Sequence, residues 1–223
     1  MGSELTLTAG DGHTLGAYRA DPADTPRGGI VVCQEIFGVN DHIREVCDGF
    51  AAGGFRAVAP ALYDRSPVRD CRLGYTPEDV ARGRELREEF SWDDTVKDVA
   101  AAVALLVKDG LPVGTVGYCW GGTISYLAGT RLPVQASVVY YGGQIMPYLE
   151  EQPNCPMLMH FGRRDQGIPL SDVDAIARAH PQATVHLYDA DHGFNCDHRG
   201  SYDASSAARA RERTLEFFGA HLG

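Results

Sequence analysis

One stretch decides the fold class of this chain: residues 113–122, which read VGTVGYCWGG. The first six residues are predicted to form a buried strand, and the last ones open a helix, so Cys119 falls in a tight strand-to-helix turn. Glycines lie two positions before and two positions after the cysteine, where only a residue without a side chain lets the two backbones pass closely. The pattern predicts a nucleophile elbow that carries cysteine instead of serine; a structural cysteine in an ordinary turn is the alternative.

Apolar segments of two kinds alternate along the rest of the chain. We expect strands at residues 5–8, 14–19, 29–36, 55–59, 113–118, 135–141, 157–161 and 185–188. Helices are expected from the cap at Asn40 or Asp41 to Gly53, at 77–90, from a Ser91–Asp94 capping box to Gly110, and at 121–129, 171–180 and 202–221. Because the inner strands are apolar on both faces, they predict an α/β fold with a mainly parallel sheet and helices on both faces. The hairpin around Gly10-Asp11-Gly12 adds an antiparallel edge.

Composition limits the classes of partner. The chain has 223 residues, 44% of them hydrophobic, and no linker or repeat divides it, so we expect a single domain over residues 1–223. Its formal charge of −10 and the lack of a basic cluster argue against a nucleic-acid partner. The longest apolar run, residues 99–107, is far shorter than the ~20 residues that cross a bilayer. We therefore expect no membrane association.

Targeting signals and cysteine spacing indicate the compartment. The amino terminus lacks a basic segment followed by an apolar one, so we expect a cytoplasmic protein. The six cysteines are scattered, without a C-x-x-C pair, which argues against a disulfide framework or a zinc finger. A monomer is the simplest expectation.

An elbow becomes an active site only when an acid and a histidine follow at corresponding strand ends. Asp165 comes directly after the strand expected at 157–161, and His192 directly after the one at 185–188. The order nucleophile, acid, histidine is the one that α/β-hydrolases use. Asp191 is the nearest rival for the acid, although its position beside His192 points its side chain elsewhere.

Several motifs resemble the dienelactone hydrolase family of α/β-hydrolases, over nearly the whole chain. They are DGHT (11–14), QEIFGVN (34–40), LY (62–63), GYCWGG (117–122) and HGF (192–194). The resemblance implies the α/β-hydrolase fold and a cofactor-free hydrolase acting on a small lactone or ester.

The same resemblance implies roles for individual residues. Cys119, Asp165 and His192 would form the catalytic triad, and Glu35 would be a fourth catalytic carboxylate beside the resting thiol. The backbone N–H groups of Ile36 and Trp120 would form the oxyanion hole.

The surroundings of Glu35 are informative without the family. It follows four apolar residues and Gln34, so it is expected to be largely desolvated and must find a partner or a proton. A structural ion pair, for instance with Arg44, is one interpretation. Gating of the thiol is the other, because a negative carboxylate would keep Cys119 neutral until substrate arrives.

The substrate side departs from the family pattern. Family members that open dienelactones hold the substrate carboxylate with two arginines, one of them four residues past the catalytic histidine; that position is Cys196 here. Arg199 lies three residues further on and is the candidate replacement. Arg82 and Arg84 are the candidates for the first arginine, and exposed helix charges are the alternative for both.

Two other classes compete with the hydrolase. Asp189, Asp191, His192, Cys196, Asp197 and His198 could bind a metal ion, but their spacing fits no standard site, and we expect neither metal nor cofactor. A silent α/β-hydrolase scaffold that only binds ligands is the second. The sequence favours a hydrolase that cleaves a small lactone or ester through a cysteine thioester, with an esterase or thioesterase for an unrelated substrate as the alternative.

Overall fold

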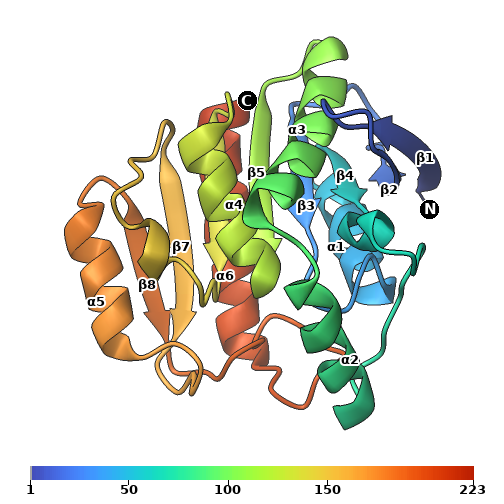
Figure 1. Ribbon diagram of the computed structural model, residues 1–223. Coiled ribbons are helices and arrows are strands. Elements are labelled where there is room, and N and C mark those ends of the chain that lie inside the picture. Colours follow the sequence, from blue (N-terminus) through green and yellow to red (C-terminus); the bar gives the residue numbers. More distant parts are fainter. Residues whose placement is uncertain (1) are drawn as a thin grey trace.

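The computed structural model describes residues 2–223, in which eight strands form a single sheet (Figure 1). The strands are β1 (Ser3–Thr8), β2 (Thr14–Ala20), β3 (Gly29–Cys33), β4 (Arg56–Pro60), β5 (Val113–Tyr118), β6 (Ala136–Tyr140), β7 (Met157–Gly162) and β8 (Thr184–Tyr188). Their order across the sheet is β1-β2-β4-β3-β5-β6-β7-β8. The β1–β2 and β2–β4 pairs are antiparallel, and every pair from β4 to β8 is parallel. The predicted sheet is confirmed.

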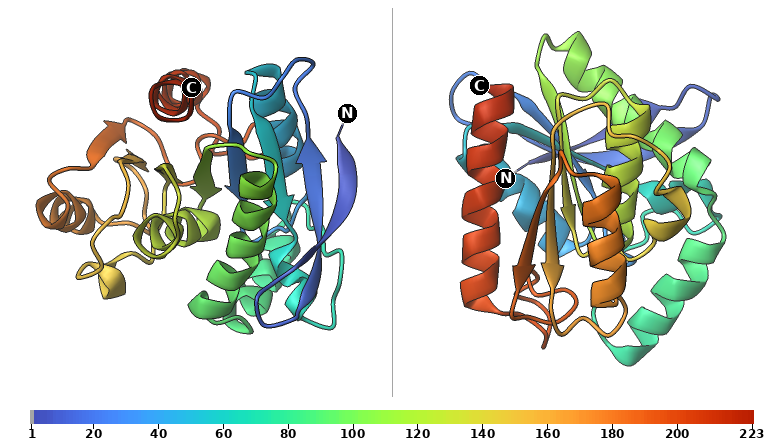
Figure 2. Two further views of the ribbon diagram at one scale, coloured as in Figure 1. Left: turned by 90° about the horizontal axis from the view of Figure 1, so that it is seen from above. Right: turned by 90° about the vertical axis from the view of Figure 1, so that its left-hand side faces the viewer.

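Residues 2–223 form six helices, five of which cover the two faces of this sheet. The six are α1 (Asp41–Ala52), α2 (Pro77–Glu88), α3 (Trp92–Lys108), α4 (Trp120–Arg131), α5 (Leu170–Ala179) and α6 (Ala204–Leu222), with short 3-10 helices at Leu62–Arg65 and Met146–Tyr148. Figure 2 shows α1 and α6 on one face and α3, α4 and α5 on the other, whereas α2 lies beyond the lower edge of the sheet in Figure 1. None of these helices is long and apolar enough to cross a membrane.

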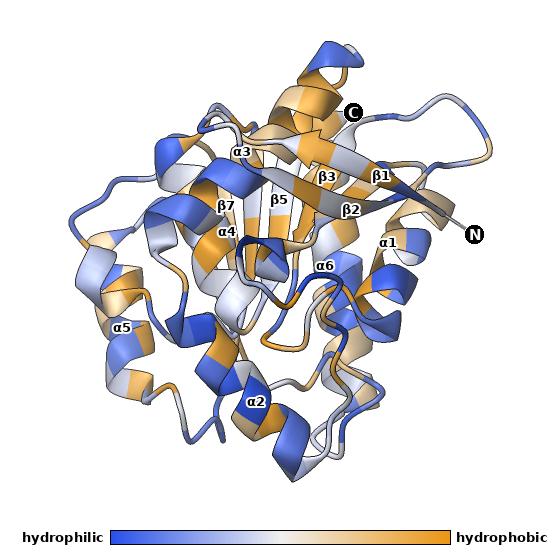
Figure 3. Cartoon of the chain, turned by 45° about the vertical axis from the view of Figure 1, so that its right-hand side comes forward, coloured by the Kyte–Doolittle hydropathy of each residue, from blue (hydrophilic) through white to orange (hydrophobic). Residues whose placement is uncertain are grey.

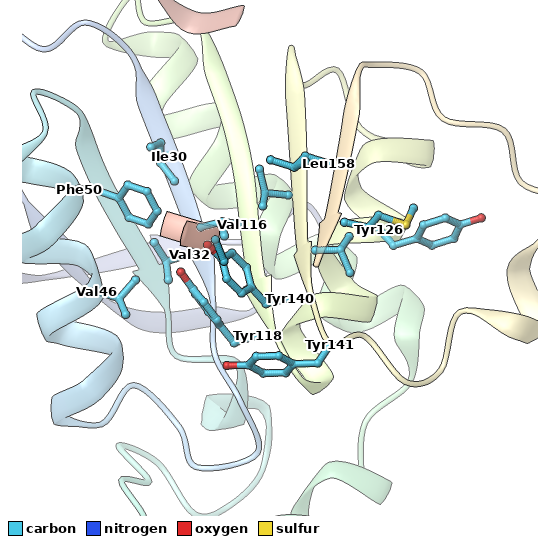
Figure 4. Packing of buried hydrophobic residues seen from close by; sticks show 14 of the residues in the cluster. Ile30, Val32, Val46, Phe50, Val116, Tyr118, Tyr126, Tyr140, Tyr141 and Leu158 are labelled. Atoms are coloured by element: carbon cyan, nitrogen blue, oxygen red, sulfur yellow. The ribbon is translucent and has the colours of Figure 1, made fainter. Parts of the chain in front are cut away.

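Both faces of the central strands are buried, as the sequence predicts. Alternate residues of β3 pack on opposite sides: Val32 joins Phe50 of α1 (Figure 4), whereas Val31 lies in the cluster that holds Leu106 of α3. Figure 3 shows the same division, with hydrophobic strands inside and hydrophilic outer helix surfaces. Each such fully buried aliphatic side chain contributes roughly 1.5–3 kcal/mol.

The strand expected at residues 29–36 is shorter than predicted and ends at Cys33. A Cβ atom at Gly121, in the first turn of α4, would lie 2.2 Å from the Cys33 carbonyl oxygen and 2.5 Å from that of Gln34. The helix therefore packs closely against the end of β3, and residues 34–36 are not part of the sheet. The other elements have ends within two residues of the prediction.

The capping box expected at Ser91 is wrong in part. The Ser91 hydroxyl accepts the N–H of Asp94, but the Asp94 carboxylate binds Lys97 instead of completing the box. A complete box occurs at the start of α2, between Thr76 and Asp79. Asn40 caps α1 through the N–H of Ile43, as one of the two predicted candidates.

Candidate active site

Cys119 stands in a strained turn between β5 and α4. Its φ of 55° and ψ of −114° lie in a region that residues with a side chain rarely adopt. A Cβ atom at Gly117 would lie 1.7 Å from the Gly121 carbonyl oxygen, and one at Gly121 would meet the backbone after β3. Both glycines are thus required by close backbone contacts, as the elbow pattern predicts. The half-buried thiol lies at the amino terminus of α4, where the free N–H groups favour negative charge.

Asp165 and His192 meet at the same edge of the sheet, which is the lower edge in Figure 1. Asp165 follows β7 and His192 follows β8, and the His192 Nδ1 to Asp165 Oδ2 distance is 2.7 Å. The Asp165 side chain is fully buried, and its other oxygen accepts the N–H of Gly167 at 2.8 Å. These two bonds fix the carboxylate, which in turn fixes the imidazole and leaves Nε2 for another partner.

Cys119 is the second group that acts on His192. Burial opposes a charge on the imidazole, but the neighbouring Cys119 sulfur and the hydrogen bond that the imidazole donates to Asp165 outweigh it and raise the pKa of His192 to about 10. The ring also packs against Tyr141, with ring centroids 5.0 Å apart. His192 is thus bonded to Asp165, and its charge is favoured by Cys119; a triad of the three residues stays a prediction.

Asp191, the rival acid, points away from this group. Its carboxylate is more than half exposed and lies 3.6 Å from Arg164, which also binds Asp189 at 2.6 Å. The acid beside the imidazole is therefore Asp165.

Glu35 lies just after β3 and is 1% exposed. Its Oε1 accepts a hydrogen bond from Arg199 Nη1 at 3.1 Å, whereas Oε2 is buried and finds no partner among residues 2–223. The expected Arg44 partner is wrong, because Arg44 binds Glu4 and the Val39 carbonyl. Burial disfavours the Arg199 charge, but Glu35, Tyr141 and Cys119 outweigh it and raise the pKa of Arg199. Arg199 is therefore a cationic neighbour of the thiol.

Glu35 has no hydrogen bond to Cys119 in the part of the chain that the structure describes. Its carboxylate is held by Arg199, so the ion-pair interpretation holds with a different arginine. The role of Glu35 toward the thiol stays a prediction.

The two candidate oxyanion donors come from the first turn of α4 and from the segment after β3. Trp120 follows Cys119 directly, and Ile36 belongs to the segment against which α4 packs. Neither the Trp120 N–H nor the Ile36 N–H has a backbone acceptor within residues 2–223. Tyr63 supports both residues: its ring stacks on Trp120 at 5.4 Å, and its hydroxyl donates to the Ile36 carbonyl at 2.9 Å.

The structure places Arg82 and Arg84 on the exposed face of α2. Arg82 forms an ion pair with Glu85 at 3.2 Å, and neither arginine bonds to Cys119, His192 or Glu35 within the described residues. Their part in substrate binding stays a prediction.

Sequence reasoning missed two residues near this group. Tyr141 has a φ of 39°, and its buried hydroxyl has no partner among the described residues. It follows β6 directly, and nothing in the neighbouring sequence indicates a position beside His192. In the sequence Tyr63 stands out only as part of the LY motif in a long loop; its contacts with Trp120 and Ile36 depend on tertiary packing.

The candidate metal ligands at residues 189–198 do not lie together in one cluster. Asp189 and Asp191 bind Arg164, and His192 binds Asp165, whereas Asp197 and His198 turn toward α1. Ligands for one ion are therefore not all gathered there.

Comparisons with known proteins agree with this geometry. The sequence profile of the dienelactone hydrolase family matches residues 15–222. The chain belongs to the dienelactone hydrolase family. A carboxymethylenebutenolidase from Pseudomonas putida is 33% identical, over 96% of this chain and 94% of its own. A crystal structure from Klebsiella pneumoniae, named a putative dienelactone hydrolase, has a TM-score of 0.85 and 29% identity and covers 99% of both chains. A Pyrococcus furiosus esterase, 14% identical, shares the fold alone, with a TM-score of 0.70 over 100% of this chain and 93% of its own.

Membership in the dienelactone hydrolase family confirms the predicted α/β-hydrolase fold. It also makes the chain a hydrolase of the lactone and ester class.

Proposed function

We propose that this dienelactone hydrolase family member cleaves a small lactone or carboxylic ester through a thioester on Cys119. The observation that carries the proposal is the His192–Asp165 hydrogen bond, formed at the edge of the sheet where the strained Cys119 turn also lies. A thiol at a helix amino terminus, a base beside it and an acid behind the base are the parts that acyl transfer needs.

The reaction takes two half-steps. The Cys119 sulfur attacks the carbonyl carbon, and its proton goes to His192 Nε2 if the thiol is still protonated. The tetrahedral intermediate collapses by breaking the carbon–oxygen bond of the ester, and the leaving alkoxide takes the proton from His192. Water then attacks the thioester, with His192 first taking its proton and then returning a proton to the Cys119 sulfur, so the acid and the free thiol are formed.

The negative oxygen of both tetrahedral intermediates needs donors. We assign this role to the backbone N–H groups of Trp120, which follows the thiol directly, and of Ile36, in the segment against which α4 packs. Tyr63 acts as a positioning residue, because it holds the Ile36 carbonyl and the Trp120 ring.

Arg199 provides the substrate contact in this proposal. Only Nη1 of its guanidinium is bonded within the described chain, to Glu35, so Nε and Nη2 are available for a substrate carboxylate. Glu35 then positions Arg199. A charge-assisted hydrogen bond contributes about 1.5–3 kcal/mol, equal to roughly a 10- to 150-fold preference in kcat/KM.

Matched substrates test this assignment. We expect a butenolide with a free carboxylate to be hydrolysed with a higher kcat/KM than its methyl ester, and Arg199→Lys to reduce that preference. The matched control is Arg178→Lys, which changes an exposed arginine on α5 and should keep the preference. Equal rates for both substrates would favour an ester hydrolase for an unrelated substrate. Binding without turnover of any lactone or ester would contradict the hydrolase itself.

Gating of the thiol by Glu35 has a separate test. Glu35→Gln keeps the shape and removes the charge, so iodoacetamide should alkylate Cys119 faster near pH 7 while turnover falls. Unchanged alkylation together with unchanged turnover would leave Glu35 as an ion-pair partner only, and a plain Cys-His-Asp mechanism.

A further inference from the structure

A second group of potential ligands lies beside the first turns of α1, apart from the Cys119 group. His42 and Glu45 are three residues apart on α1, so their side chains share a face. Asp197 and His198 reach the same place from the loop between β8 and α6. One nitrogen or oxygen of each residue lies within 4.8 Å of those of the other three.

His42 is the unusual member of this group. It is 3% exposed, yet neither ring nitrogen takes part in a hydrogen bond within residues 2–223. Nδ1 lies 3.5 Å from Asp197 Oδ1, inside the group. Buried polar atoms nearly always have a partner.

The charges of the group call for a cation. Glu45 and Asp197 have no arginine or lysine partner in the described chain; their charged neighbours there are the histidines. The group thus holds two carboxylates without an arginine or lysine beside them, and a divalent cation would balance their charge.

We propose that His42, Glu45, Asp197 and His198 form a zinc site that joins α1 to the loop before α6. Two imidazoles and two carboxylates suit Zn²⁺, and a tetrahedral site with ligand bonds near 2.05 Å separates its ligand atoms by about 3.4 Å. The observed separations are 2.8 Å for His198 to Glu45, 3.5 Å for His42 to Asp197 and 3.9 Å for His198 to Asp197. These separations lie on both sides of the tetrahedral value, and Glu45, Asp197 and His198 are partly exposed, so an ion can reach them.

A competing ligand set shares His42. Glu35, His42 and Cys196 also offer ligand atoms within 4.8 Å of one another. However, Glu35 is already bonded to the Arg199 guanidinium, whose positive charge repels a cation, and this set has only three buried ligands. The set that includes Glu45 is therefore favoured.

Zinc at this place would be a structural link and not part of acyl transfer. It would fix Asp197 and His198, which immediately precede Arg199. The inference does not depend on the proposed hydrolase activity.

Zinc titration of the metal-free full chain tests the site. Cys119→Ala is used as the background, because the thiol and His192 could otherwise bind zinc themselves. We expect one zinc ion per chain by calorimetry and a higher melting temperature with zinc. His198→Ala and Glu45→Gln should each weaken binding by about 100-fold or more, since even residues around a metal's ligands change affinity by 10- to 100-fold.

Controls separate this site from other zinc binding. His221→Ala removes a histidine at the end of α6, outside the group, and should leave the affinity unchanged. Cys196→Ser should also bind normally, and cobalt should give visible d–d bands without a thiolate charge-transfer band. Loss of affinity in Cys196→Ser would instead assign the ion to Glu35, His42 and Cys196. Binding that no variant weakens would mean adventitious zinc only and would overturn the proposal.

Discussion

Removing the Arg199 charge should cost more stability than removing the Glu35 charge. Glu35 is 1% exposed, whereas the Arg199 side chain is 20% exposed. Arg199→Met leaves a buried carboxylate without its cation, which costs about 3–5 kcal/mol. Glu35→Gln leaves an arginine that water still reaches and keeps an amide oxygen as acceptor, so the expected cost is only about 1 kcal/mol. The double variant carries no buried charge and should be more stable than Arg199→Met alone.

Urea unfolding at pH 7 measures all three variants against the parent chain. In a parallel thermal melt, a loss of 3–5 kcal/mol should lower the melting temperature of a protein of this size by roughly 6–20 °C. Arg82→Met is the control, because its exposed ion pair with Glu85 should contribute less than about 1 kcal/mol. If Arg199→Met proves no more costly than Glu35→Gln, Glu35 is not a buried charge that depends on Arg199, and the reasoning fails.

Three further predictions follow from the same geometry. The pKa of His192 is raised from an ordinary 6.5 to about 10, so folding stabilises its protonated form. The resulting contribution to the free energy of unfolding is fully present below pH 6.5 and is lost as the pH rises through about 10. The stability advantage of the parent chain over Asp165→Asn should follow that course in urea unfolding, and its loss by pH 7 would contradict the raised pKa. Gly121→Ala should destabilise the fold by about 1–3 kcal/mol or more, because its Cβ would lie 2.2 Å from the Cys33 carbonyl oxygen. A Cβ at Gly10 meets nothing within 4 Å, so Gly10→Ala should leave the stability nearly unchanged. Equal melting temperatures for the two variants would refute the close approach. EDTA should leave the hydrolysis of a neutral aryl ester, which does not use Arg199, unchanged, since acyl transfer here needs no metal ion; loss of this activity in EDTA that zinc restores would argue for a catalytic metal.

The sheet and its covering helices were predictable because each strand carries its own burial pattern. The elbow was predictable because Gly117 and Gly121 are needed where two backbone segments pass closely, and few other turns need glycine at both positions. The positions of Asp165 and His192 followed from the rule that parallel strands end at one edge, and the structure brings the two together.

Partnerships between distant segments were not predictable. Glu35 needs a cation, but the sequence does not say whether Arg44 or Arg199 supplies it, because that depends on how the loop after β8 folds back over β3. The end of β3 at Cys33 depends likewise on the packing of α4. Asp197 and His198 could not be assigned to His42 and Glu45 from spacing, since the two pairs lie on different elements.

The central claim is a covalent intermediate on Cys119, and peptide mass spectrometry of the quenched protein tests it most directly. The protein is mixed rapidly with an activated aryl ester, quenched in acid and digested. We predict a mass increase equal to the acyl group on the peptide that contains Cys119, and neither adduct nor turnover in a Cys119→Ala variant that still folds. Near-normal turnover by Cys119→Ala, or an acyl group on another residue, would contradict the account.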